Sequence, residues 1–129
     1  MISVAIWITS EEARIFTFKA DGTDVHHMHH HGPKHTSEVH GRNHPKDAGD
    51  AEHFFHQVAE HLAAHAKGSR WLIAGPGMAK THFKAHIERH HAAFAKSIVG
   101  VESMDKGTDG EIKNFAHDFF KKLGTFESL

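Results

Sequence analysis

The spacing of β-branched apolar residues at the start of the chain predicts an antiparallel hairpin. Apolar residues occupy every second position from Ile2 to Ile8, and a second apolar stretch at 14–19 follows a short polar turn. Because successive side chains of a strand point to opposite faces, this spacing is typical of β-structure. Another turn at 20–24 precedes residues 25–31, which we expect to form a third strand.

The pattern then changes twice. Residues 32–50 carry Gly, Pro, Asn, Asp and charged side chains without apolar periodicity, which predicts a long exposed loop. Long loops inside compact domains are often functional. In residues 51–66 the apolar positions recur at the spacing of one helix face, so we expect an amphipathic helix there. The apolar positions are Phe55, Val58, Ala59, Leu62 and Ala66.

A short continuous apolar run at 71–74 predicts a strand that is covered on both faces. The turn residues Gly75, Pro76 and Gly77 end this run. Two glycines and a proline allow the backbone to leave a sheet sharply. After the turn, the apolar residues Phe83, Ile87 and Phe94 indicate a second amphipathic helix.

The last part of the chain predicts one more strand and one more helix. Residues 97–101 read as a buried strand. Thr108 and Glu111 have the spacing of a capping box, which predicts the start of a helix that reaches Leu123. The element order is then βββαβαβα, an α/β arrangement in which a mixed five-stranded sheet carries helices. We expect a single domain over 1–129.

Composition narrows the class of protein. The chain has 129 residues, 39% of them hydrophobic, and no cysteine, which excludes disulfides and thiolate chemistry. The start has neither a basic segment nor an apolar run of membrane-spanning length, so we expect a cytoplasmic protein. The formal net charge is only −1, but 17 histidines would make the charge more positive on mild acidification.

Motifs of the common enzyme classes are missing from the sequence. The first strand offers no carboxylates for a two-metal nuclease site. No Gly-x-Ser-x-Gly elbow or Walker loop occurs, and Gly75-x-Gly77 lacks the third glycine of a dinucleotide fingerprint. We therefore expect a protein that is not an enzyme and requires no cofactor.

The most conspicuous candidate for chemistry is a histidine tract at 26–31. On a strand, His27, His29 and His31 would share one face, while His26 and His30 would share the other. Imidazole is a common ligand for zinc and nickel, so the first three are candidate metal ligands. The simpler interpretation is a solvated edge strand, because no established ligand spacing is present.

Two helical histidine pairs have four-residue spacing, namely His61 with His65 and His86 with His90. Glu88 does not follow His86 directly, which excludes the zinc-protease motif. The second pair flanks apolar positions of its helix. We therefore expect His86 and His90 to be partly buried packing residues rather than ligands.

Residues 71–83 combine a strand, the Gly-Pro-Gly turn, Lys80 and Phe83. This signature resembles the middle domain of archaeal Pelota proteins and of class I archaeal and eukaryotic peptide release factors. The expected strand at 97–101 and the helix at 111–123 are similar to the closing elements of that domain. The resemblance covers nearly the whole chain and implies an RNase H-like fold.

The resemblance also implies a function in translation. His40-Gly41-Arg42 is similar to the lead-in of the release-factor catalytic loop, but Asn43-His44-Pro45 stands where those proteins have the hydrolytic Gly-Gly-Gln. We therefore expect a stand-alone, non-catalytic protein that contacts the ribosome, rRNA or tRNA through its loop. The candidate RNA-contact residues are Lys34, His40, Arg42, His44 and Lys46.

Two alternatives remain open. One is a metal-binding protein that holds zinc or nickel on the histidine tract. The other is a structural module in which an edge strand pairs with a second copy of the chain.

Overall fold

The computed structural model of the chain describes residues 2–30 and 44–127, with the side chains of residues 2–30 and 51–124. Across these residues the helices and strands follow the order βββαβαβα, with a short 3-10 helix before the last strand. The predicted element order is confirmed.

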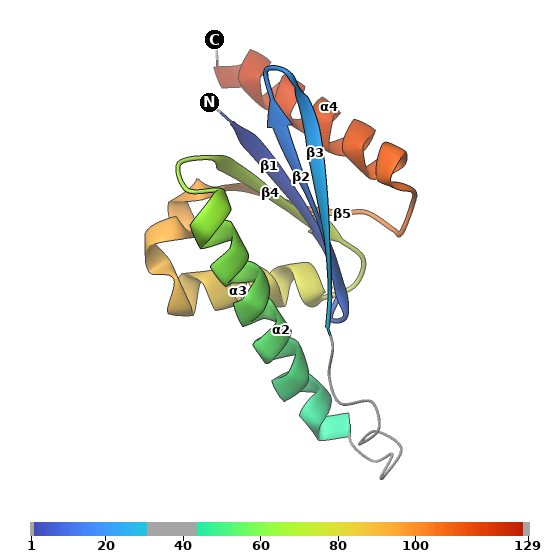
Figure 1. Cartoon of the computed structure of the whole chain (residues 1–129), viewed down its shortest axis with the longest axis vertical. Helices are drawn as coiled ribbons and strands as arrows, with labels where there is room; N and C mark the ends of the chain where they lie inside the picture. Colours follow the sequence, from blue (N-terminus) through green and yellow to red (C-terminus); the bar gives the residue numbers. More distant parts are fainter. Residues whose placement is uncertain (1, 31–43, 128–129) are drawn as a thin grey trace.

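The described strands form one mixed sheet with the spatial order β3-β2-β1-β4-β5 (Figure 1). Their bounds are β1 Ser3–Ile8, β2 Glu12–Lys19, β3 Gly22–His29, β4 Arg70–Gly75 and β5 Ile98–Ser103. The first three strands pair antiparallel, whereas β4 runs parallel to β1 and β5 runs parallel to β4. The prediction of a five-stranded mixed sheet is confirmed.

Helices cover both faces of this sheet. α2 (His44–His65) and α3 (Ala79–His90) lie on one face, and α4 (Asp109–Glu127) lies on the other (Figure 1). The 3-10 helix η1 (Ala92–Ser97) follows α3. Each of these helices is too short or too polar to cross a membrane.

The central strands contribute to two apolar cores, because their alternate side chains point to opposite faces. On β1, Ile6 packs with the core under α2 and α3, whereas Trp7 packs with the core under α4. Both tryptophans are fully buried, and each indole N–H is satisfied. Trp7 Nε1 donates to the carbonyl of Met104 at 3.1 Å, and Trp71 Nε1 donates to that of Ala66 at 3.1 Å.

The predicted loop at 32–50 is wrong from residue 44 onward, whereas residues 32–43 lie outside the described residues. α2 begins at His44 rather than near Ala51, so residues 44–50 are helical. Pro45 is the second residue of the helix, where a missing backbone N–H costs no intrahelical hydrogen bond. The acidic residue at 47, in the first turn, also favours a helix start. The sequence pattern read these polar residues as loop because they lack an apolar face.

Two further expectations in the second half of the chain are corrected. β5 is half-buried rather than buried, because it is an edge strand of the described sheet. Phe94 belongs to η1 rather than to α3, and it stacks on Trp71 with ring centroids 5.5 Å apart. The other edge is β3, so pairing of an edge strand with a second copy stays a prediction.

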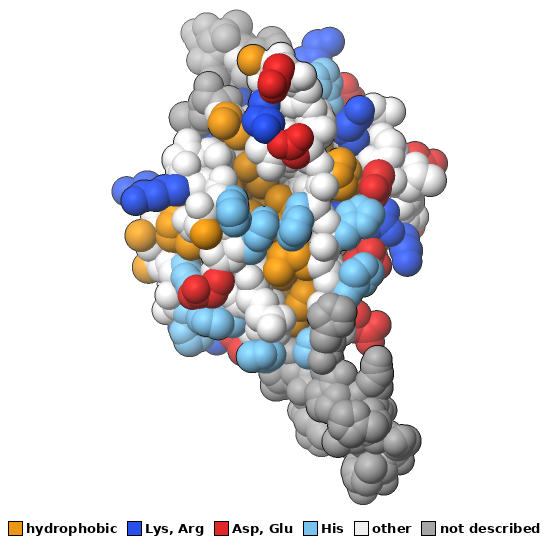
Figure 2. Space-filling model, viewed as in Figure 1, with side chains coloured by type: hydrophobic (Ala, Val, Ile, Leu, Met, Phe, Trp, Pro, Cys, Tyr) orange, Lys and Arg blue, Asp and Glu red, His pale blue; other side chains and the backbone are white. Residues whose placement is uncertain are grey.

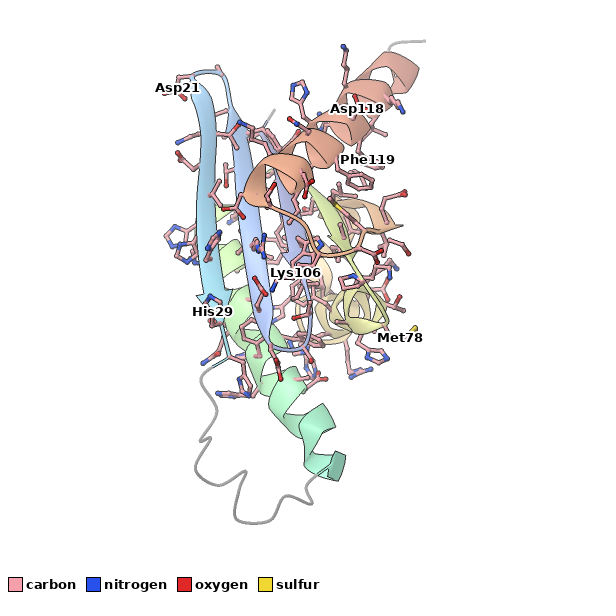
Figure 3. The ribbon with its side chains drawn as sticks, turned by 90° about the vertical axis from the view of Figure 1, so that its right-hand side faces the viewer. Asp21, His29, Met78, Lys106, Asp118 and Phe119 are labelled. Carbon is pink, nitrogen blue, oxygen red and sulfur yellow. The ribbon has the colours of Figure 1, made fainter. Side chains whose placement is uncertain are left out.

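The capping box of α4 is confirmed. The backbone N–H of Thr108 donates to Oε1 of Glu111 at 2.8 Å, and the N–H of Glu111 donates to Oγ1 of Thr108 at 3.1 Å. This reciprocal arrangement sets where α4 starts. Phe119 of α4 then lies over Gly100 of β5, where a Cβ atom would be 2.5 Å from the ring (Figure 3).

Candidate functional site

Histidine side chains gather on the face of the molecule formed by β3, α2 and α3 (Figure 2). They form two groups. The strand–helix histidines are His26, His61 and His65. The interhelical cluster comprises Glu52, His56, His86, His90 and His91.

The strand–helix histidines join β3 to α2. His26 stacks on His61 with ring centroids 4.4 Å apart and ring planes only 2° from parallel, and His61 contacts His65 at 4.5 Å. Burial, reinforced by the charges of His26 and His65, lowers the pKa of His61 below its ordinary value of 6.5. The stack therefore favours a neutral imidazole at position 61.

The interhelical cluster lies where α2 packs on α3. Glu52 and His56 are one helical turn apart on α2, His86 and His90 are one turn apart on α3, and His91 ends α3. The His86 side chain is 3% exposed and packs against Phe55, with ring centroids 6.5 Å apart. The cluster thus has a buried centre and an exposed rim.

Glu52 is the carboxylate of this cluster. Its Oε2 atom lies 2.5 Å from Nδ1 of His86 and 3.9 Å from both Arg89 Nη1 and His90 Nε2. The hydrogen bond from His86, opposed by burial and helped by the nearby positive groups, lowers the pKa of Glu52 below its ordinary 4.5. An ionised carboxylate only accepts, so Nδ1 of His86 carries the donated hydrogen.

Two histidines of the interhelical cluster each have a ring nitrogen without a partner in the described structure. Nε2 of His86 and Nε2 of His91 are buried and have no hydrogen-bond partner among the described residues. Burial, followed by the charges of His86 and His56, lowers the pKa of His91 below 6.5.

Two groups of three side chains in the cluster have the spacing of metal ligands. They are His56 with His86 and His91, and Glu52 with His86 and His90, and in each group the ligand atoms lie within 4.8 Å of one another.

Sequence reasoning identified part of this cluster. His86 is a buried packing residue as expected, but the side chain of His90 is 48% exposed. Glu52, His56 and His91 were not singled out. Their only local signal is the four-residue spacing on α2 and the adjacent pair at 90 and 91, because the cluster forms only when two helices distant in sequence pack together.

Two of the three predicted metal ligands of the histidine tract, His27 and His29, alternate with His26 along β3 and so lie on the other face of the strand. Nε2 of His27 lies 2.9 Å from Oδ2 of Asp109 at the start of α4. His29 lies at the end of β3, as Figure 3 shows. No potential three-ligand group in the described part of the chain includes His27 or His29. His31 lies outside the described residues.

The partner of His27, Asp109, belongs to a network of ion pairs. Arg14 bonds Glu12 at 2.8 Å and Asp109 at 3.2 Å, and Lys106 Nζ lies 3.5 Å from Glu12 (Figure 3). Arg14 also donates to the carbonyl of Gly107 at 2.8 Å. This network ties β2 to the start of α4, and His27 lies at its edge.

The Gly-Pro-Gly turn has the geometry that its residues predict. Gly75 has φ +148° and Gly77 has φ +62°, and a Cβ atom on Gly75 would lie 2.4 Å from the carbonyl oxygen of Ile8. Phe83 is fully buried and packs edge-to-face on Phe55. It anchors α3 to the core, as expected. Met78 is 61% exposed at the start of α3 (Figure 3).

The candidate RNA-contact residues stay a prediction. Lys34, His40 and Arg42 lie outside the described residues. His44 and Lys46 belong to the beginning of α2 rather than to a loop.

The sheet order and the helices on both its faces define an RNase H-like fold. Two solved Pelota structures share it, both with 16% sequence identity. The match to Thermoplasma acidophilum Pelota has a TM-score of 0.60 and covers 89% of this chain. That to Archaeoglobus fulgidus Pelota has a TM-score of 0.61 and covers 94%.

An archaeal translation termination factor also shares the fold, with 17% identity, a TM-score of 0.59 and 84% of this chain covered. The matched region is 31% of each of these three proteins. No protein-family model matches the chain, and no curated protein matches it in sequence. The expected Pelota-like and release-factor-like fold is confirmed.

Proposed function

We propose that this protein is a non-catalytic translation-associated factor that binds the ribosome through rRNA or tRNA. The observation that carries the proposal is the similarity of nearly the whole chain to Pelota and to a termination factor. The sequence signature around Gly75, Lys80 and Phe83 supports it independently. A ribosomal partner would place the protein in the cytoplasm.

The sequence after Arg42 supports a role without hydrolysis. Arg42 is followed by Asn43-His44-Pro45, which offers no glycine pair and no glutamine for peptidyl-tRNA hydrolysis. Because the chain corresponds to only 31% of each similar protein, the proposal concerns the contacts of one domain.

Phosphate groups are the proposed targets of the RNA-contact residues. Lys34, Arg42 and Lys46 supply permanent positive charge, and protonated His40 and His44 would add to it. Binding through phosphate contacts releases counterions from the RNA. Added salt makes this release less favourable, so binding weakens as the salt concentration rises. We therefore expect salt-sensitive association that strengthens at mildly acidic pH.

The test is cosedimentation with purified ribosomes in low salt. Arg42→Glu combined with Lys46→Glu should reduce the bound fraction by at least about 10-fold, because two phosphate contacts become repulsive. The control is Lys113→Glu combined with Lys122→Glu, which makes the same charge change on the exposed side of α4. Equal loss in both variants, or no loss in the first, would contradict the assignment of Arg42 and Lys46 as RNA contacts.

A further inference from the structure

His86 has an unusual environment for a packing residue. Its ring is buried between α2 and α3, Nδ1 is bonded to Glu52, and Nε2 has no partner in the described structure. A buried polar atom without a hydrogen bond is costly, so native structures rarely leave one. With Nδ1 as the donor to Glu52, a neutral His86 presents Nε2 as a lone-pair acceptor.

His91 presents the same feature from another direction. Its Nε2 atom is also buried and unpartnered within the described ranges, and its ring centroid lies 5.7 Å from that of His86. His56 of α2 approaches both rings, at 5.9 Å from His86 and 5.6 Å from His91. Three imidazole rings therefore converge on one small region: one from α2, one from α3 and one from the residue that follows α3.

We propose that His56, His86 and His91 bind a divalent first-row transition metal ion of the zinc class, which links α2 to the end of α3. Glu52 would be the outer carboxylate that orients His86, an arrangement that metal-binding histidines commonly have. The fourth coordination position would be open toward solvent beside the exposed His56.

The charges around the three rings favour a cation. Glu52 bonds His86, and Oε2 of Glu60 lies 3.5 Å from Nε2 of His56. The ligand atoms lie within 4.8 Å of one another, whereas tetrahedral Zn–N bonds of about 2.0 Å require a separation of about 3.3 Å. His56 has a half-exposed side chain, so it can move inward on binding.

The other candidate group, Glu52 with His86 and His90, is less favourable. A metal in this group would be bound by Glu52 itself, which would then no longer accept the hydrogen bond from Nδ1 of His86. The buried Nε2 atom of His91 would still have no partner in the described structure. The unpartnered nitrogens of both His86 and His91 are accounted for only by the first group.

The experiment is zinc titration by calorimetry, at pH 7.5, on the full chain made without a polyhistidine tag and stripped of metal. Three forms are compared: the unaltered protein, His56→Ala/His91→Ala, and His27→Ala/His29→Ala. None of the altered residues is fully buried, so the variants should fold, and circular dichroism checks this. The first double variant should lose affinity by at least about 100-fold, while the second should keep a site of the original affinity.

Thermal unfolding gives an independent readout. Zinc should raise the Tm of the unaltered protein and of His27→Ala/His29→Ala, but not that of His56→Ala/His91→Ala. Three results would each overturn the proposal. They are no zinc binding tighter than millimolar, unchanged binding in His56→Ala/His91→Ala, and loss confined to His27→Ala/His29→Ala, which would place the metal on the histidine tract.

Discussion

Glu52 and His86, 34 positions apart in the chain, meet through a 2.5 Å contact between Oε2 and Nδ1 that joins α2 to α3. The contact pairs a partly exposed carboxylate with a buried imidazole. The other ring nitrogen of His86 has no hydrogen-bond partner in the described structure, and the His86 ring lies 5.9 Å from that of His56 and 5.7 Å from that of His91. The contact is therefore a structural link beside the metal site that we propose.

Glu52→Gln tests the two roles of this contact. Glutamine keeps the shape but removes the charge, so the free energy of unfolding should fall by about 1 kcal/mol without metal. Zinc affinity should fall by about 10-fold, because His86 loses the carboxylate that orients it. Urea unfolding and calorimetry measure the two effects.

Glu88→Gln is the matched control, since Glu88 lies on the exposed side of α3 and pairs with Lys84. It should leave both quantities nearly unchanged. Wild-type stability and zinc affinity in Glu52→Gln would show that the contact contributes to neither.

The stacked histidines predict that acid destabilises the fold. The pKa of His61 is lower in the folded protein than its ordinary 6.5, chiefly through burial and then through His26 and His65. As the pH falls, His61 therefore takes up a proton in the unfolded chain before it does so in the folded protein. The stabilising contribution is complete above pH 6.5 and is lost as the pH falls through the folded pKa.

Thermal unfolding in the presence of a chelator, from pH 8 to pH 5, measures this dependence. His61→Gln should flatten the fall in Tm below pH 6.5, whereas His53→Gln, at an exposed position of α2, should keep the original slope. If both variants follow the unaltered protein, the His26–His61 stack does not control the acid sensitivity.

Gly75→Ala tests the strand-to-helix turn. The new Cβ would lie 2.4 Å from the Ile8 carbonyl oxygen at a φ of +148°, so we expect a loss of about 2–3 kcal/mol in the free energy of unfolding. Gly77→Ala has open space and φ +62°, so it should cost about 1 kcal/mol. Urea unfolding measures both free energies. If Gly75→Ala and Gly77→Ala lose the same free energy of unfolding, the close approach to β1 is not the reason for glycine at position 75.

Elements with strong local signals could be predicted from the sequence. The first strand, the turn at Gly75 and the Thr108–Glu111 box each depend on neighbouring residues, and the structure has each of them. The start of α2 was missed because its first residues are polar and resembled a loop.

The candidate site was harder to predict. His86 could be recognised as a packing residue from its place beside Phe83 and Ile87. Its partners Glu52 and His56 lie on another helix, and no local pattern indicates which helices will meet. The unpartnered Nε2 atoms likewise become visible only once the surrounding side chains are placed.

Sedimentation of the unaltered protein with purified ribosomes tests the central claim most directly. The proposed function predicts that the protein sediments with whole ribosomes or one subunit in low salt and is released as salt rises. Protein that stays in the supernatant at every salt concentration, with its fold verified by circular dichroism, would contradict a ribosome-directed role.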